Sequence, residues 1–201
     1  MEKVVHVQYE GNIATVTMSR PEAMNAVNIK MMEELELTFR ELKEREDIQI
    51  VILKGEGRAF SAGGDIKQML SNELTDRMDD VMDIVSNMAM HMYQLPQIMI
   101  SHVQGAAAGI GLSIALSSDY IVAERASKIA MNFIGIGLVP DGGGHFFLKE
   151  RLGAERAKQL IWQGKVMEAE EAYRLELVDE IVENGDTESF ETFIRKLQQA
   201  P

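Results

Sequence analysis

A glycine- and alanine-rich stretch at residues 97–119 constrains the fold more than any other part of the chain. It runs from an apolar segment through Gly105 into a small-residue segment that carries Gly109 and Gly111. Glycine permits sharp turns and close backbone approach, so we expect a buried strand, a tight turn and a buried helix. Free amides at the start of that helix could face an electron-rich atom. The stretch predicts either an oxyanion-binding turn or a central helix that simply packs tightly against a sheet.

Two other glycine-dependent sites do not fit this stretch. A dinucleotide-binding turn needs Gly-x-Gly-x-x-Gly, whereas the glycines here are spaced Gly105-x-x-x-Gly109-x-Gly111. A phosphate-binding loop of the Walker type needs Gly-Lys-Ser/Thr after its glycines, and that tripeptide does not occur in the chain. Both nucleotide-binding interpretations are therefore excluded.

A second glycine-containing turn follows another predicted strand. Residues 48–53 are apolar except for Gln49, which is typical of a strand covered on both faces, and residues 54–67 then carry Gly63 and Gly64 before a helical pattern. An oxyanion hole needs two amides from separate turns, because one donor cannot hold a developing negative oxygen in place. Because the chain has two such turns, at Gly64 and near Gly109, we favour an oxyanion-binding site over a helix that simply packs tightly against a sheet.

The rest of the chain alternates strand and helix patterns. We expect a hairpin over residues 3–18 and a helix capped by Asn28. The buried stripe of that helix is predicted to comprise Met31, Met32, Leu35, Phe39 and Leu42, and a second helix over 76–95 carries Met78, Met82, Val85, Ala89 and Met92 on one stripe. Further strands are expected at 120–123, 129–133 and 177–182, and further helices from His145 and at 153–163, 168–175 and 186–199.

The composition of the chain argues against several classes of function. The chain has 201 residues, which favours one domain over residues 1–201, and a formal charge of −12, which argues against nucleic-acid binding. The absence of cysteine excludes thiolate chemistry, and the four histidines are too scattered to suggest a metal site. With no membrane-length apolar run and no signal region, we expect a cytoplasmic protein without membrane contact. An anionic ligand would need local cations, for which the candidates are Arg20, Lys30, Lys54, Arg58 and Lys67.

A third glycine-rich loop, residues 135–144, places a single carboxylate, Asp141, between Pro140 and three glycines. A carboxylate in a turn often only caps or bends the backbone. On the loop alone, a structural role for Asp141 is therefore better supported than a catalytic one.

Five blocks in register resemble the crotonase superfamily, the enoyl-CoA hydratase/isomerase family. They are Arg20-Pro-Glu-Ala-Met-Asn-Ala26, Arg58-Ala-Phe-Ser-Ala-Gly-Gly-Asp-Ile-Lys67, Val103-Gln-Gly-Ala-Ala-Ala-Gly-Ile-Gly-Leu112, Ser118-Asp119 and Gly135-Ile-Gly-Leu-Val-Pro-Asp-Gly-Gly-Gly144. The resemblance implies an α/β, ClpP-like fold of repeated β-β-α units. It also implies coenzyme A thioesters as substrates, no separate cofactor, and a homotrimer or dimer of trimers.

The resemblance also assigns roles to residues. The backbone N–H groups of Gly64 and Ile110 are expected to form the oxyanion hole, and the carbonyl of Ala62 to meet the adenine. The other residues expected at the CoA moiety are Ala23, Met24, Ala26, Asp65, Ile66, Lys67 and Gly109, and those expected at the acyl group are Met69, Ser113, Phe133 and Pro140. The chain ends earlier than is usual in the family, so residues 185–201 are expected to begin a C-terminal helical region whose trimerisation helices are missing.

Departures from the family pattern favour one reaction. The two positions that carry glutamates in the hydratases are Ser113 and Phe133 here, which disfavours ordinary hydration. Asp141 occupies the place where several isomerases of the family carry their single acid/base. The resemblance therefore implies isomerisation of an enoyl-CoA with Asp141 as the acid/base.

Other activities stay open at this point. They are hydration of a 2-enoyl-CoA with a relocated water, a 1,2-epoxyphenylacetyl-CoA-type isomerisation, and a non-catalytic CoA-binding or RNA-binding role. The Clp-type serine proteases share the fold, but Ser113 lies in Gly111-Leu-Ser-Ile-Ala115, which lacks the second glycine of the Gly-x-Ser-x-Gly setting that such nucleophiles use.

Overall fold

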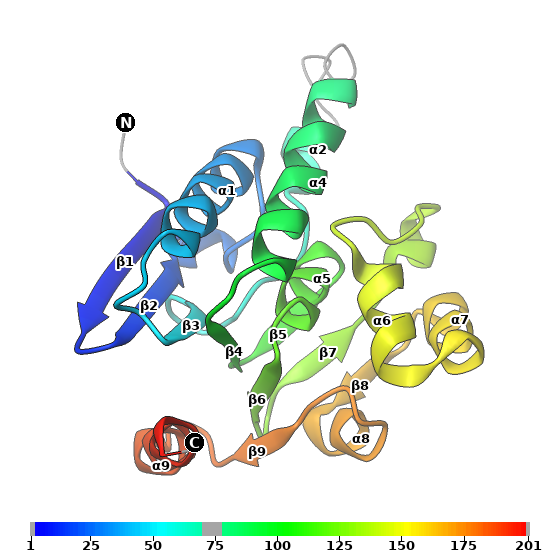
Figure 1. Ribbon diagram of the computed structural model, residues 1–201. Coiled ribbons are helices and arrows are strands. Elements are labelled where there is room, and N and C mark those ends of the chain that lie inside the picture. The colour runs from blue at the N-terminus through cyan, green and yellow to red at the C-terminus, as the bar shows by residue number, and fades with distance from the viewer. Residues whose placement is uncertain (1–2, 70–77, 200–201) are drawn as a thin grey trace.

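The large sheet has six strands in the order β1-β2-β3-β4-β6-β9 (Figure 1). The computed structural model describes residues 3–69 and 78–199, without the side chains of Met69 and Met78. The first two strands form the predicted antiparallel hairpin, and the remaining neighbours are parallel. The strands are β1 (Val5–Glu10), β2 (Ile13–Met18), β3 (Ile50–Gly55), β4 (Ile98–Val103), β6 (Tyr120–Glu124) and β9 (Glu180–Val182).

A small second sheet corrects the prediction for the central stretch. The segment Ala106–Ala108, which the sequence placed in or near a helix, is strand β5, and it pairs with β7 (Lys128–Ala130), which in turn pairs with β8 (Val166–Glu168). Helix α5 (Ile110–Leu116) begins only after this strand. Pairing with distant strands therefore overrides the helix propensity of alanine at these three positions.

Helix α1 (Ile29–Lys43) has the predicted cap and the predicted buried face. The side chain of Asn28 accepts a hydrogen bond from the Met31 amide at 2.9 Å, and the buried residues of the helix are the five that the helical period indicated. Helix α4 (Met78–Tyr93) packs against α1. Its predicted stripe is only partly buried, because Met82 is 42% exposed and Met88, outside the stripe, is fully buried.

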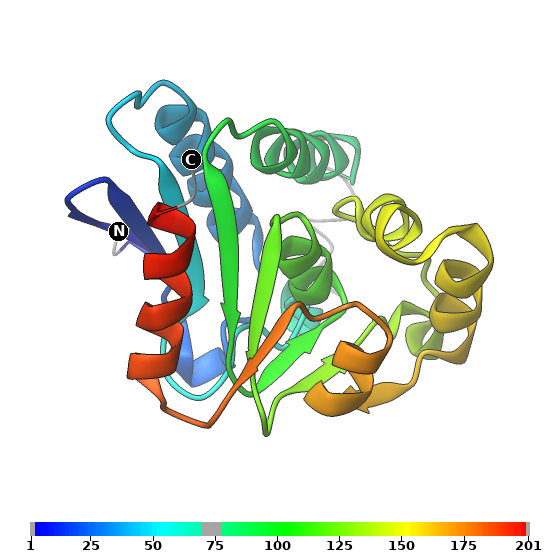
Figure 2. The same cartoon turned by 60° about the horizontal axis from the view of Figure 1, so that its bottom comes forward.

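The two faces of the large sheet carry different layers. Along β3, Val51 and Leu53 belong to the main core under α1, α4 and α5, whereas Ile50 and Ile52 face helix α9 (Thr187–Gln198) on the other side. Figure 2 shows α9, in red, lying along the sheet on the side away from α5. The alternation of side chains along a strand explains why the apolar run of β3 is buried on both faces.

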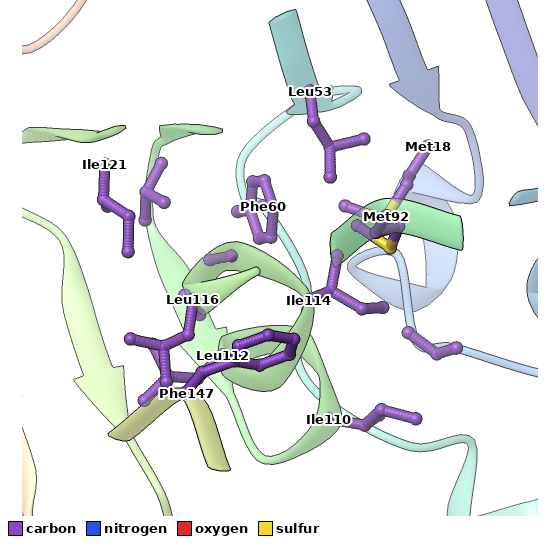
Figure 3. Packing of buried hydrophobic residues seen from close by; sticks show 14 of the residues in the cluster. Met18, Leu53, Phe60, Met92, Ile110, Leu112, Ile114, Leu116, Ile121 and Phe147 are labelled. Atoms are coloured by element: carbon purple, nitrogen blue, oxygen red, sulfur yellow. The ribbon is translucent and has the colours of Figure 1, made fainter. Parts of the chain in front are cut away.

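Helix α5 is the centre of the main core, and all seven of its residues are buried. Figure 3 shows side chains of this helix among core residues from β2, β3, α4, β6 and α6, namely Ile110, Leu112, Ile114 and Leu116 with Met18, Leu53, Phe60, Met92, Ile121 and Phe147. A helix enclosed in this way fixes the position of its own first turn. That first turn is the part of α5 that reaches the candidate site.

Short helices complete the chain. They are η1 (Pro21–Ala23), α2 (Ile66–Met69), η2 (Phe133–Ile136), α6 (Gly144–Leu152), α7 (Ala154–Gln163) and α8 (Ala169–Arg174). Within residues 3–69 and 78–199, no helix combines the length and the apolar character that crossing a bilayer requires.

Candidate active site

The structure places the two predicted turns against each other. Ser61 pairs with β5, since its amide donates to the Ala106 carbonyl at 2.9 Å and its carbonyl accepts from the Ala108 amide at 3.1 Å. A methyl group added to Gly109 would lie 3.9 Å from the Cα atom of Gly63. Both glycines have positive φ angles, 107° at Gly63 and 52° at Gly109. The positive φ angles favour glycine at both positions, and at Gly63 an added methyl group would also lie 3.0 Å from the Ala108 carbonyl oxygen.

The Gly64 amide faces away from its neighbouring segment. Gly64 forms a parallel bridge with Val27, in which the Val27 amide donates to the Gly63 carbonyl at 2.8 Å and the Asp65 amide donates to the Val27 carbonyl at 2.9 Å. In a parallel bridge the flanking residues make both hydrogen bonds, so the N–H of Gly64 itself points to the opposite side. Gly64 lines a cavity on that side.

Ile110 lines the same cavity from the other turn. Ile110 is the first residue of α5, so its N–H is one of those that an α-helix leaves without an intrahelical acceptor. Neither this amide nor that of Gly64 donates a hydrogen bond to another residue in the described part of the chain. Two available main-chain donors therefore line one cavity.

The cavity has a volume of about 200 Å³ and a mostly apolar wall. It opens between α1, α2, α4, the first turn of α5 and η2. Its lining residues are Val27, Ile29, Met32, Ala62, Gly63, Gly64, Asp65, Ile66, Gln68, Val81, Met82, Val85, Gly109, Ile110, Asn132, Phe133, Ile136, Leu138 and Asp141. Apolar walls with a few polar groups at one end are typical of a small-molecule site.

Asp141 is held at the cavity by a turn that packs on α5. A methyl group added to Gly142 would lie 3.2 Å from a side-chain carbon of Ile110, so the turn follows the first turn of α5 closely. The Asp141 carbonyl accepts a hydrogen bond from the Gly144 amide at 2.9 Å, which closes the turn. The Asp141 carboxylate thereby lines the cavity together with Gly64 and Ile110.

Burial changes the acidity of Asp141. Its Oδ1 atom is buried and has no hydrogen-bond partner among the described residues. Loss of contact with water disfavours the charged form, and this burial raises the pKa of Asp141 from 3.8 to about 6. A carboxylate with such a pKa is a stronger base than an ordinary aspartate and is still ionised near neutral pH.

Asp65 is the other carboxylate on the wall of the described cavity, and its surroundings favour its charged form. Its Oδ2 atom accepts a hydrogen bond from an Arg20 guanidinium nitrogen at 2.9 Å. Partial burial alone would raise the pKa of Asp65, but hydrogen bonds from Arg20 and from the Gln68 and Lys67 amides hold it below its usual value. Asp65 is therefore an ion-pair partner, and Asp141 is the carboxylate that is free to exchange a proton.

The structure gathers most, but not all, of the predicted site residues. Those that line the cavity are Ala62, Gly64, Asp65, Ile66, Gly109, Ile110, Phe133 and Asp141. Ala23, Met24 and Ala26 lie on the segment that pairs with residues 62–65, outside the cavity wall, and Lys67 is exposed on α2. The side chain of Met69 lies outside the described residues.

Contrary to the prediction for the acyl pocket, Ser113 and Pro140 are not among the lining residues. Ser113 is fully buried one turn after Ile110, where it faces the start of α6 rather than the cavity. A methyl group added to Gly144 would overlap the Ser113 Oγ atom. Pro140 is also buried, next to the lining residue Asp141.

Sequence reasoning missed the wall that α1 and α4 contribute. Met32, Val81, Met82 and Val85 line the cavity. The helical period marked Met82 and Val85 as one face of a helix, but an apolar stripe has the same pattern whether it faces a core or a cavity. The candidate cation Lys54 lies elsewhere, in a groove on the α9 side of the sheet.

Across residues 3–69 and 78–199, no three histidine or carboxylate side chains are grouped as a metal ion would require. The candidate site thus offers two amides, one basic carboxylate and an apolar wall. Such a set can stabilise a negative oxygen while a proton is moved nearby.

Comparison with known proteins identifies close relatives. The sequence model of the Enoyl-CoA hydratase/isomerase family matches residues 8–199. The Bacillus subtilis (strain 168) protein YhaR, provisionally named an enoyl-CoA hydratase/isomerase, is 42% identical over 197 residues, which cover 97% of this chain and 77% of YhaR. The trans-2-decenoyl-[acyl-carrier-protein] isomerase of Streptococcus mutans serotype c is 29% identical over 184 residues, covering 90% of this chain and 70% of that protein.

A solved structure shares the fold of this chain. It is the crystal structure of a provisionally named enoyl-CoA hydratase from Thermobifida fusca YX in complex with acetoacetyl-CoA. The TM-score is 0.91 at 26% sequence identity, and the match covers 99% of this chain and 82% of that one. The relatives therefore include proteins named as hydratases and as isomerases.

Proposed function

This chain belongs to the enoyl-CoA hydratase/isomerase family, and from that premise we propose that it isomerises the double bond of an enoyl-CoA with Asp141 as the acid/base. The observation that supports this most directly is that Asp141 shares one cavity with the Gly64 and Ile110 amides. The two amides are the proposed oxyanion hole, and they would hold the thioester oxygen.

The proposed reaction is a proton transfer between two carbons. Asp141 removes a proton from C2 of a 3-enoyl-CoA, and the electron pair moves into a dienolate whose oxygen is bound by the two amides. The protonated Asp141 then returns a proton to C4, which gives the 2-enoyl-CoA and restores the carboxylate. One carboxylate is enough for this cycle, because no water is added and no further cofactor takes part.

Isomerisation is preferred over hydration because the site has a single available acid/base. Among the cavity residues of the described chain, the carboxylates are Asp65 and Asp141, and Asp65 is paired with Arg20. At the two hydratase positions, Ser113 is enclosed against α6 and Phe133 presents an aromatic ring. Neither side chain can activate water as a glutamate would.

The family resemblance and the acetoacetyl-CoA complex of the Thermobifida fusca relative support a CoA thioester as the substrate. We place the CoA moiety along the segments of Ala23–Ala26 and Ala62–Lys67, with the acyl group against the apolar wall. A homotrimer or dimer of trimers and a cytoplasmic location belong to the same proposal. Light scattering of the purified protein and cell fractionation test these two points.

The test is Asp141→Asn assayed with a 3-enoyl-CoA. We expect kcat for isomerisation to fall by roughly two to four orders of magnitude, because the asparagine amide cannot accept the C2 proton. Asp186→Asn is the matched control: Asp186 caps α9, far along the chain, and asparagine caps helices equally well. Full retained isomerisation in Asp141→Asn would remove Asp141 from the mechanism.

A second assay separates isomerisation from hydration. Water addition to crotonyl-CoA is followed by the loss of the conjugated thioester absorbance in the same preparations. We expect isomerisation to be much faster than hydration in the unmodified protein. Hydration as fast as isomerisation would show that a water site exists without the two glutamates.

A further inference from the structure

Arg20 joins the two segments that hold the Gly64 amide. One of its guanidinium nitrogens donates to the Ala26 carbonyl at 2.5 Å, and another donates to Asp65 Oδ2 at 2.9 Å. The two side chains are 18% and 17% exposed, so the pair is largely shielded from water. The guanidinium therefore bridges the residue before Val27 and the residue after Gly64.

The bridged residues flank the hydrogen bonds that orient Gly64. The Val27 amide donates to the Gly63 carbonyl and the Asp65 amide donates to the Val27 carbonyl, and these two bonds direct the Gly64 N–H towards the cavity. Arg20 links Ala26 and Asp65, which lie at the ends of these two paired segments. A planar guanidinium suits the position, because it can donate to a carbonyl and a carboxylate at once in a fixed geometry.

Arg20 is itself built on a fixed turn. Its amide donates to Asn25 Oδ1 at 2.8 Å, and its carbonyl accepts from the Asn25 amide at 2.9 Å. Asn25 is fully buried with a φ of 53°, and its Nδ2 atom donates to the Ala59 carbonyl at 2.7 Å. The base of the Arg20 side chain thus has little freedom, which allows its far end to hold Asp65.

We propose that Arg20 is a positioning residue for the Gly64 donor, acting through Ala26 and Asp65. The inference rests on the proposed function in assigning Gly64 to the oxyanion hole, but the bridge itself is a property of the fold. Two effects follow from it. The pairing of residues 26–27 with 63–65 stays closed, and the Asp65 charge beside Gly64 is neutralised.

The second effect matters for the chemistry. Asp65 follows Gly64 directly and lines the same cavity. Without Arg20, an unpaired carboxylate would face the oxygen on which negative charge develops, and like charges repel most strongly in a site of low dielectric constant. Loss of Arg20 should therefore impair the reaction step more than substrate binding.

The experiment compares Arg20→Met with Arg151→Met. Arg151 is a close structural match: it pairs with Asp179 at 3.0 Å, donates to the Ser118 carbonyl at 2.9 Å, and its side chain is 15% exposed. It lies outside the cavity wall. Both variants lose a shielded arginine that links a carboxylate to a carbonyl, but only Arg20 does so beside Gly64.

We expect Arg20→Met to lower kcat for isomerisation roughly 10- to 100-fold with KM changed less than about threefold, since a displaced donor loses its effect in the transition state. Arg151→Met should retain kcat, and Arg20→Lys should recover part of the loss. Hydrogen exchange followed by NMR should show faster exchange of the Val27 and Asp65 amides in Arg20→Met alone.

Three results would overturn the proposal. One is an unchanged kcat in Arg20→Met, and a second is a rise in KM alone, which would make Arg20 a contact for the CoA phosphates. The third is unchanged exchange of the Val27 and Asp65 amides. That measurement needs no substrate. It therefore tests whether Arg20 holds the two segments together even if the unmodified protein proves inactive and the proposed function fails. If Arg20→Met does not fold, Asp65→Asn weakens the same bridge without leaving an unpaired carboxylate, and faster exchange of the Val27 amide is then the expected result, whereas unchanged exchange would overturn the proposal.

Discussion

Asp141→Asn should stabilise the folded protein while abolishing its proposed activity. Burial raises the pKa of Asp141 from 3.8 to about 6, so folding places a carboxylate where its charged form is disfavoured. The neutral amide of asparagine has a similar shape and carries no such charge. The difference in unfolding free energy between Asp141→Asn and the parent should therefore change with pH, and its sign is set by the raised pKa of Asp141.

The sign and magnitude follow from the two pKa values. Below pH 4 the carboxyl is protonated in both folded and unfolded states and its ionisation costs nothing. Between pH 4 and 6 the unfolded state loses the proton first, so the parent loses stability as the pH rises. Above pH 6 the cost is fully present. A difference of about two pKa units at about 1.4 kcal/mol per unit gives about 3 kcal/mol at neutral pH.

Urea unfolding at pH 4, 5, 6, 7 and 8 measures this effect. The difference in unfolding free energy, Asp141→Asn minus parent, should grow by about 2 to 3 kcal/mol from pH 4 to pH 8. Using the change with pH removes any constant cost of the asparagine amide in the cavity. Asp186→Asn is a control that should stay nearly flat over this range, because hydrogen bonds from the Ser189 hydroxyl and amide lower the pKa of Asp186 and so keep its titration in the folded protein below pH 4. A flat difference for Asp141→Asn across this range would refute the argument from burial.

Three further predictions concern stability. Met88→Ala should cost about 2 to 5 kcal/mol by urea unfolding because Met88 is fully buried, whereas Met90→Ala, at a residue 49% exposed, should stay within about 0.5 kcal/mol. Gly111→Ala should cost about 1 to 3 kcal/mol by thermal unfolding, since the added carbon would lie 2.7 Å from the Ser61 Cβ atom. Burial lowers the pKa of His102, so the parent should lose stability relative to His102→Gln as the pH falls below 6.5, measured by urea unfolding.

Local patterns were enough to predict the elements whose partners are close in sequence. In α1, the period of the apolar residues gave all five buried positions, and the side chain of Asn28 makes the capping bond that its position before the helix indicated. The hairpin of β1 and β2 was predicted for the same reason, because its turn lies between the two strands. The cap joins residues three positions apart, and the hairpin pairs residues no more than 13 positions apart.

Long-range pairing explains where the prediction was wrong or incomplete. Ala106–Ala108 forms a strand because Ser61 and β7 supply its hydrogen-bond partners, and both lie outside the local window. Strand β8 was not predicted at all. Its three residues, Val166–Glu168, pair with β7, and the middle one is the only one buried. A strand of this length has too few residues to show an alternating pattern.

Predicting the candidate site requires both local sequence patterns and long-range contacts. The turns at Gly63–Gly64 and Gly109 could be found from the sequence because Gly63 and Gly109 have positive φ angles, which favour glycine wherever the fold later places the turn. The basicity of Asp141 could not, because an aspartate between proline and glycine has an ordinary pKa when water reaches it. Its pKa is raised by burial in a turn that packs on the first turn of α5, through Gly142 and Ile110. Gly142 has a φ of 56°, and a methyl group added there would lie 3.2 Å from Ile110, so a bulkier residue at position 142 should strain the turn that keeps Asp141 buried.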